Sequence, residues 1–212
     1  MPFLPATEID PAGRYALVPE PGSDSIRISQ IDARTRRFIA HGTAGLRRGA
    51  GPIQLLFHPD LPVIYVANAG NSTIAACHWD AATGHAAFAQ AIRTVPLSHS
   101  DTNTLMGIAI GPGGRYLYAA NRGHDSIALF ALQRGKGKMF LRMREMLPCA
   151  PSGPPVIEEM GTRMTLPASA TALQFAVQPA NGMLSRVEND ASAGTSAGIV
   201  QTRAVVPGRA CD

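Results

Sequence analysis

The sequence lacks the features that mark membrane, fibrous and disulfide-rich proteins. No apolar run reaches the roughly 18 residues of a membrane-spanning helix, and residues 1–5 (MPFLP) lack the basic and then apolar pattern of a signal peptide. The three cysteines, Cys77, Cys149 and Cys211, form no CxxC pair, and their odd number does not fit a framework of paired disulfides. We therefore expect a cytoplasmic protein without a metal, a cofactor or a membrane partner.

Charged and aromatic residues are also scarce, at 16% and 6% of the 212 residues. Lysine is rare, since only Lys136 and Lys138 occur among the 19 lysines and arginines. The chain has no basic run of the kind that binds nucleic acid, so its net charge of +4 does not predict a nucleic-acid partner. Glycine (21 residues) and proline (17 residues) are abundant, which indicates many turns.

Three segments of the chain align with one another without gaps. Their prolines, Pro11, Pro59 and Pro112, recur at a period of about 50 residues. Such a period, with several short strands in each unit, is typical of β-propeller blades. In the second unit we expect antiparallel strands at 53–57, 63–67, 73–79 and 86–92. The predicted fold class is therefore all-β, with three four-stranded blades at about 5–45, 51–95 and 104–142, and an incomplete ring.

The repeat is not recognisable after residue 142, where the fourth strand of the third unit (139–142) is expected to end. Residues 143–212 are rich in Ala, Ser, Pro and Gly and hold one aromatic residue, Phe175. This composition buries little apolar surface against the entropy of ordering the chain. We expect a partial propeller over residues 1–142 and a largely disordered, low-complexity tail over residues 143–212, with local order around 171–177.

The third repeat, with NRGHDSI at residues 121–127, resembles the lactonase family of seven-bladed β-propellers. DPAGRY at 10–15, FHP at 57–59, YVAN at 65–68 and the Asn103–Thr104 pair are similar to motifs of the same family. That family includes 6-phosphogluconolactonases and 3-carboxymuconate lactonising enzymes. The resemblance covers about three blades of seven. It implies a hydrolase that opens a sugar-acid lactone such as 6-phosphogluconolactone, in a truncated form. Gly107 departs from the family pattern, because an acidic residue is frequent at that place.

Propeller geometry predicts where the candidate site lies. The turns between second and third strands share one face with the loops that enter the next blade, here residues 42–51 and 93–104. This face should gather Glu20, Asn68, Asn121, Arg122, His124, Arg47, Arg48, His99 and Asn103. Cations, imidazoles and amides around one depression suit an anionic lactone as the small-molecule partner.

Lactone hydrolysis needs a general base and a donor to the developing oxyanion. His124 is the first candidate for the base, because an imidazole titrates near neutral pH, and Glu20 is the second. Arg122 is the candidate for the oxyanion donor. The expected substrate-binding residues are Asn121, Asn68, Asn103 and His99.

Each of these residues also has a purely structural interpretation. Arg122 fits a contact between blades, His124 fits a loop histidine bonded to Asp125 or to the backbone, and the asparagines Asn68 and Asn121 fit turn caps. For the whole chain, a non-catalytic binding platform or an inactive fragment are the alternatives to a lactonase. Three blades leave strand edges open, so self-association through these edges is also expected.

Overall fold

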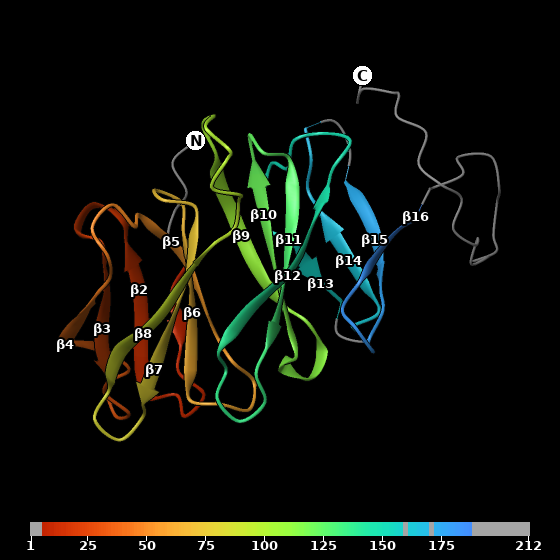
Figure 1. The fold of residues 1–212 in the computed structure, drawn as a ribbon. Coiled ribbons are helices and arrows are strands. Elements are labelled where there is room, and N and C mark those ends of the chain that lie inside the picture. Colours follow the sequence, from red (N-terminus) through yellow and green to blue (C-terminus); the bar gives the residue numbers. More distant parts are fainter. Residues whose placement is uncertain (1–5, 159–160, 170–171, 188–212) are drawn as a thin grey trace.

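The computed structural model of the protein describes residues 6–158, 161–169 and 172–187, and these residues form four antiparallel sheets of four strands each (Figure 1). The first sheet contains β1 (Glu8–Ile9), β2 (Tyr15–Glu20), β3 (Ser25–Ile31) and β4 (Phe38–Gly45). The second contains β5 (Pro52–Phe57), β6 (Val63–Asn68), β7 (Thr73–Asp80) and β8 (His85–Arg93). The third contains β9 (Thr104–Ile110), β10 (Tyr116–Arg122), β11 (Ser126–Leu132) and β12 (Met139–Met146). The fourth contains β13 (Val156–Ile157), β14 (Arg163–Leu166), β15 (Leu173–Val177) and β16 (Leu184–Val187).

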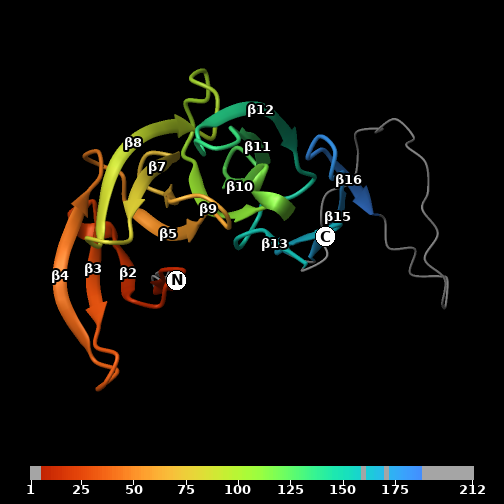
Figure 2. The ribbon, with the colours of Figure 1, turned by 90° about the horizontal axis from the view of Figure 1, so that it is seen from below.

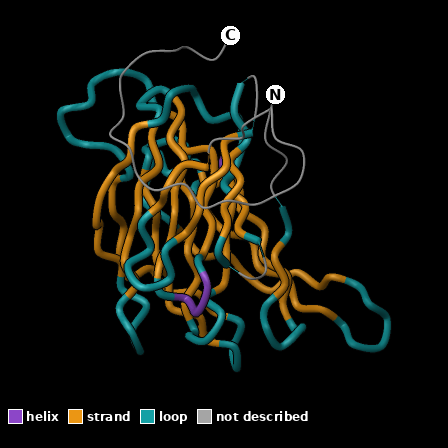
Figure 3. Tube along the Cα trace, turned by 90° about the vertical axis from the view of Figure 1, so that its right-hand side faces the viewer, coloured by secondary structure: helices purple, strands orange, loops and turns teal. Residues whose placement is uncertain are grey.

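Helix is confined to two short 3₁₀ turns in the described part of the chain, η1 (Pro21–Ser23) and η2 (Pro112–Gly114), so strand dominates the trace in Figure 3. No helix among the described residues is long and apolar enough to cross a membrane.

The four sheets stand side by side in an open arc, as Figure 2 shows. Within each sheet the strands follow chain order, so β5, β9 and β13 lie on the inner side of the arc, while β4, β8 and β12 lie on its outer side. This is the arrangement of propeller blades around a ring that these sheets do not close. The all-β, incomplete propeller predicted from the repeat is confirmed.

The core consists of three apolar layers, one between each pair of neighbouring sheets. Strand β6 is buried along its whole length, because its side chains alternate between two of these layers. Ile64 and Val66 pack towards the first sheet, whereas Val63 and Tyr65 pack towards the third. A strand covered on both faces reads as a continuous apolar run, which explains the sequence VIYVA in β6.

The prediction of a largely disordered segment after residue 142 is wrong for residues 143–187 as far as the structure describes them. Strand β12 continues to Met146, and a fourth sheet follows it. Leu166, Leu173 and Phe175 are buried against Tyr118 of the third sheet. Short strands with few aromatics suffice here, because the third sheet supplies half of the shared apolar layer. The order expected around 171–177 coincides with β15, and residues 188–212 lie outside the described residues.

Turns of the fourth sheet carry a repeat signal that a search for proline and tyrosine motifs misses. The turn before β14 has a hydrogen bond from the Gly161 amide to the Glu158 carbonyl, and the turn before β2 has the same bond from Gly13 to Asp10. The turn before β16 (QPANG, 178–182) has a hydrogen bond from the Gly182 amide to the Gln178 carbonyl. The matching turn of the third sheet (QRGKG, 133–137) has the same bond from the Gly137 amide to the Gln133 carbonyl. Glycine at these turn positions therefore indicates the fourth sheet where side-chain motifs do not.

Candidate functional site

The face predicted to carry the site is built by three equivalent turns between second and third strands. Asp24, Ser72 and Asp125 occupy the same place in these turns, with φ angles of 51°, 52° and 47°. The carbonyl oxygen of each accepts a hydrogen bond from the loop that enters the next sheet, from the amides of Leu46, Thr94 and Leu147 respectively. Each turn is thereby fixed to the following entry loop, which brings side chains from two distant segments together.

The junction of the second and third sheets holds a continuous polar network around Asn121. This side chain is fully buried, and its Oδ1 accepts hydrogen bonds from Thr94 Oγ1 at 2.6 Å and from Asn103 Nδ2 at 3.4 Å. Asn121 Nδ2 donates to Ser126 Oγ at 3.3 Å, and Asn103 Oδ1 accepts the His124 amide at 3.2 Å. The network thus holds the backbone that carries His124. We call His99, Asn103, Asn121, His124, Ser126 and Arg144 the His124 cluster.

His124 has two close neighbours in this cluster. Its Nδ1 lies 2.7 Å from Ser126 Oγ, and its ring meets that of His99 edge-on with 4.8 Å between centroids. Burial lowers the pKa of His124 below its ordinary value, and His99 and Arg144 lower that pKa further, while Asp125 raises it. His124 is therefore an uncharged imidazole at neutral pH, the form that accepts a proton.

Arg144 is a member of the cluster that the sequence analysis missed. Its Nε donates to the Thr94 carbonyl at 2.7 Å, and burial and the neighbouring Arg93 lower its pKa. The expected strand 139–142 stopped short of this residue, whereas β12 runs on to Met146 and carries it to the site. The longer apolar alternation in β12, Met139, Leu141 and Met143, is the signal that extends the strand.

The structure brings together four of the predicted site residues, His99, Asn103, Asn121 and His124, but leaves three apart from them. Glu20 Oε1 pairs with Arg27 Nε at 2.8 Å within the first sheet. Asn68 Nδ2 donates to Thr73 Oγ1 at 3.0 Å within the second sheet, which is the bonding of a hairpin cap. Arg122 ends β10 beside the cluster in sequence, and its side chain is exposed.

The two arginines expected from the first entry loop are also placed elsewhere. The Arg47 guanidinium lies 5.4 Å from the ring centroid of Phe88, over the outer strand of the second sheet. Arg48 acts on Asp24, whose pKa is lowered chiefly by hydrogen bonds from the Gly51 and Gly49 amides. Among the described residues, Arg144 therefore supplies the positive charge of the cluster, and the first entry loop does not.

Gly107 on the inner strand β9 shows why this chain has no acid at that place. A Cβ atom there would lie 2.5 Å from Pro154 Cβ and 2.7 Å from Gln54 Oε1, and the φ of Gly107 is 145°. Gln54 itself is fixed by two hydrogen bonds with Ile108. Its Oε1 accepts the Ile108 amide at 2.8 Å, and its Nε2 donates to the Ile108 carbonyl at 3.2 Å. Close packing of the inner strands thus occupies the space that a carboxylate would need.

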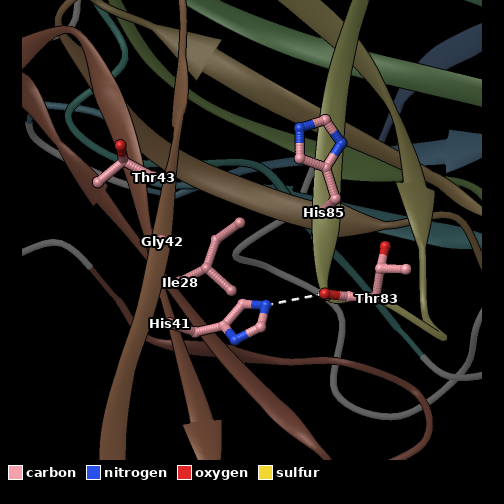
Figure 4. Close-up of a pocket in the computed structure, with 7 residues that line it drawn as sticks. Ile28, His41, Gly42, Thr43, Thr83 and His85 are labelled. Atoms are coloured by element: carbon pink, nitrogen blue, oxygen red, sulfur yellow. Dashed lines mark hydrogen bonds between the residues drawn. The ribbon is translucent and has the colours of Figure 1, made fainter.

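Two grooves lie on the outer side of the arc, and no predicted site residue lines either of them. The first groove, of about 360 Å³, lies between the first and second sheets (Figure 4). The second groove, of about 560 Å³, lies between the second and third sheets and is lined by both lysines of the chain.

Comparison with known proteins identifies sequence relatives over most of the chain. The sequence model of the family described as "Lactonase, 7-bladed beta-propeller" matches residues 6–201. A 6-phosphogluconolactonase from Pectobacterium carotovorum is 29% identical over 150 residues, which are 70% of this chain and 45% of that protein. The chain spans less than half of the length of this relative.

Solved structures share the same arrangement of sheets. A protein from Lactobacillus plantarum superimposes with a TM-score of 0.81 at 22% identity, covering 86% of this chain and 53% of that one. A periplasmic gluconolactonase from Pseudomonas aeruginosa gives a TM-score of 0.79 at 18% identity, covering 86% of this chain and 52% of that one. Likeness at this level of identity shows the fold alone.

Proposed function

Because this chain belongs to the lactonase family of seven-bladed β-propellers, we propose that it is a lactonase-like hydrolase that opens the ring of a sugar-acid lactone. Sequence relatives named 6-phosphogluconolactonase support this class of substrate. The observation that carries the proposal is the neutral His124 imidazole. Its Nδ1 bonds to the buried Ser126 hydroxyl, which in turn accepts a hydrogen bond from buried Asn121, and Arg144 lies near enough to lower its pKa.

In the proposed mechanism, His124 acts as a general base on water. The tautomer that does this has its proton on Nδ1 and donates it to Ser126 Oγ, which leaves Nε2 free to accept the proton of a water molecule. The hydroxide formed adds to the lactone carbonyl, and the resulting oxyanion is stabilised by the guanidinium of Arg144, the cation of the cluster. The ring oxygen then leaves with the proton held by the imidazolium, and the product is the open hydroxy acid.

Ser126 is not the nucleophile in this proposal, although a serine beside a histidine has the required pairing. Its side chain is fully buried at the start of β11, so a lactone carbonyl has no approach to it. Its hydroxyl is instead a positioning group that orients the imidazole. Asn121, equally buried, supports Ser126, while the half-buried Asn103 and His99 border the base and are proposed to contact substrate.

The test replaces His124 with Gln in the full chain and follows hydrolysis of 6-phosphogluconolactone above its spontaneous rate. We expect the rate to fall at least tenfold, within the roughly 10²–10⁴-fold that general-base assistance supplies. Since the pKa of His124 is lowered, wild-type activity should persist as the pH falls below the ordinary histidine pKa of about 6.5. His85→Gln, an exposed imidazole in the first groove, is the control and should retain the rate. Equal rates in wild type and His124→Gln contradict the assignment.

A binding platform without catalysis is the second candidate function. It is favoured by the two grooves, neither of which opens on the His124 cluster. Saturable binding of the lactone with no turnover in the wild-type chain would support this candidate over the first.

A further inference from the structure

The two grooves on the outer side of the arc are made by one structural device used twice. In each, the turn between third and fourth strands reaches across to the preceding sheet. Thr83, Gly84 and His85 do so in the first groove, and Lys136, Gly137 and Lys138 do so in the second. Ile28 pairs with Gly42 at the floor of the first groove, and Ala76 pairs with Gln90 at the same place in the second.

The walls of the second groove are fixed by hydrogen bonds between the sheets. Tyr65 Oη donates to the Gly137 carbonyl at 2.6 Å. Gln90 Nε2 donates to the Met139 carbonyl at 3.1 Å, and the Met139 amide donates to Gln90 Oε1 at 3.0 Å. Both bridges hold the lysine-bearing turn at a set distance from β6 and β8, so the groove is formed before any ligand arrives.

Charge distinguishes the second groove from the first. The second has two ammonium groups and the exposed His78, whereas the first carries His41, His85, Thr43 and Thr83 (Figure 4). None of the residues that line the second groove is acidic. The Lys138 ammonium lies 5.7 Å from the ring centroid of Phe140, a contact that restricts its position.

The remainder of the second groove is apolar. Leu61, Val63 and Ala76 line it, together with Cys77. Burial raises the pKa of the Cys77 thiol to about 11, so this side chain is uncharged and adds apolar surface. A volume of about 560 Å³ falls within the size range of small-molecule sites.

We propose that the second groove binds a small organic anion, with a compact apolar or aromatic body and a phosphate or carboxylate head group. The body lies over Leu61, Val63 and Ala76, and the head group lies between the two lysines. Lysine binds phosphate and carboxylate as a compact point charge, without the fixed geometry that arginine needs. The groove and the His124 cluster lie at opposite ends of β11, so this site is separate from the one proposed for the lactone.

The test titrates phenyl phosphate and benzoate into the full chain by calorimetry, with NMR observation of the backbone amides of residues 135–138. We expect saturable binding of at least one probe, with shifts confined to the groove. The double variant Lys136→Thr/Lys138→His installs the side chains found in the first groove, and it should weaken binding at least tenfold without a change in melting temperature. The stronger probe identifies the head group.

The control is Arg134→Gln, which removes one positive charge from the same turn outside the groove lining. It should leave the affinity within about twofold, because screened charges at the surface contribute little. Equal weakening by Arg134→Gln and by the lysine double variant would show attraction by net charge and overturn the proposal. Binding of inorganic phosphate as tightly as phenyl phosphate would overturn the part that assigns an apolar body, and absence of saturable binding would overturn the whole.

Discussion

The turn between third and fourth strands in the first sheet lacks a glycine that the same turn has in the other three sheets. All four turns close with a hydrogen bond from the amide of their fifth residue to the carbonyl of their first, and that fifth residue has a positive φ. It is glycine in the second, third and fourth sheets, at Gly84, Gly137 and Gly182, with φ angles of 66°, 65° and 74°. It is Arg36 in the first sheet, with a φ of 57°.

Contact with a preceding sheet accounts for this difference. A Cβ atom on Gly84 would lie 2.3 Å from the Tyr15 ring, and one on Gly182 would lie 2.5 Å from the Tyr116 ring. Arg36 is exposed, and its turn touches no preceding sheet among the described residues. A positive φ alone tolerates a side chain at a cost of about 1–2 kcal/mol, whereas close approach of a neighbouring sheet does not. Glycine at the fifth position therefore marks the turns that pack against a preceding sheet.

Of the variants that test this comparison, Gly137→Ala should lower the free energy of unfolding most. The new Cβ would meet Val63 Cγ2 and Tyr65 Oη at 2.9 Å, so overpacking of about 1–3 kcal/mol adds to the cost of the positive φ. We expect the free energy of unfolding in urea to fall by about 3 kcal/mol. Gly135→Ala is the matched control, since Gly135 has a φ of 71° with no atom within 4 Å of the new Cβ. Equal losses in the two variants would show that the turn, and not the neighbouring sheet, requires glycine.

How far the sequence predicts the fold depends on the same contacts. The first three sheets are evident from proline and glycine at turns and from tyrosine in the strands that follow, because these residues recur at one period. The fourth sheet lacks such motifs. Leu166 and Phe175 can be recognised as core residues only once the third sheet is known to pack against them. Local composition underestimates order in a segment when a neighbouring sheet supplies half of its apolar layer. In residues 143–187 the sequence feature that indicates a further sheet is glycine at two turns, Gly161 and Gly182.

For the candidate site, repeat geometry predicts which residues approach one another better than it predicts how they are bonded. The order of strands predicts His99, Asn103 and His124 on one face, and the structure brings them together. It predicts Glu20 on the same face, but the pairing of Glu20 with Arg27 inside the first sheet is set by a register that the sequence does not reveal. The catalytic and substrate-binding roles of these residues, and the cytoplasmic location, stay predictions.

Tyr65→Phe tests the hydrogen bond between Tyr65 and Gly137, which belongs to the same contact that leaves no room for a side chain at Gly137. The Tyr65 hydroxyl is buried and donates to the Gly137 carbonyl, and Tyr118 makes the same bond to Gly182 at 2.8 Å in the next pair of sheets. Removal leaves that carbonyl without its partner, so we expect a loss of about 1–2 kcal/mol in the free energy of unfolding. The first sheet has Leu17 at the equivalent register and makes no such bond. A loss below about 0.3 kcal/mol would mean that this hydrogen bond adds little to the contact between the sheets.

Arg36→Gly should have the smallest effect on stability. It tests the exposed turn of the first sheet, which packs against no preceding sheet among the described residues. Glycine relieves the positive φ of this residue, worth about 1–2 kcal/mol, but it costs about 0.5–1 kcal/mol of added freedom in the unfolded chain. The net change should be a stabilisation of less than about 1.5 kcal/mol, measured by the same urea unfolding. Since the Arg36 turn touches no preceding sheet among the described residues, no packing term enters. A destabilisation of more than about 1 kcal/mol would mean that the Arg36 side chain makes a contact of its own, and the first turn would then be constrained like the other three.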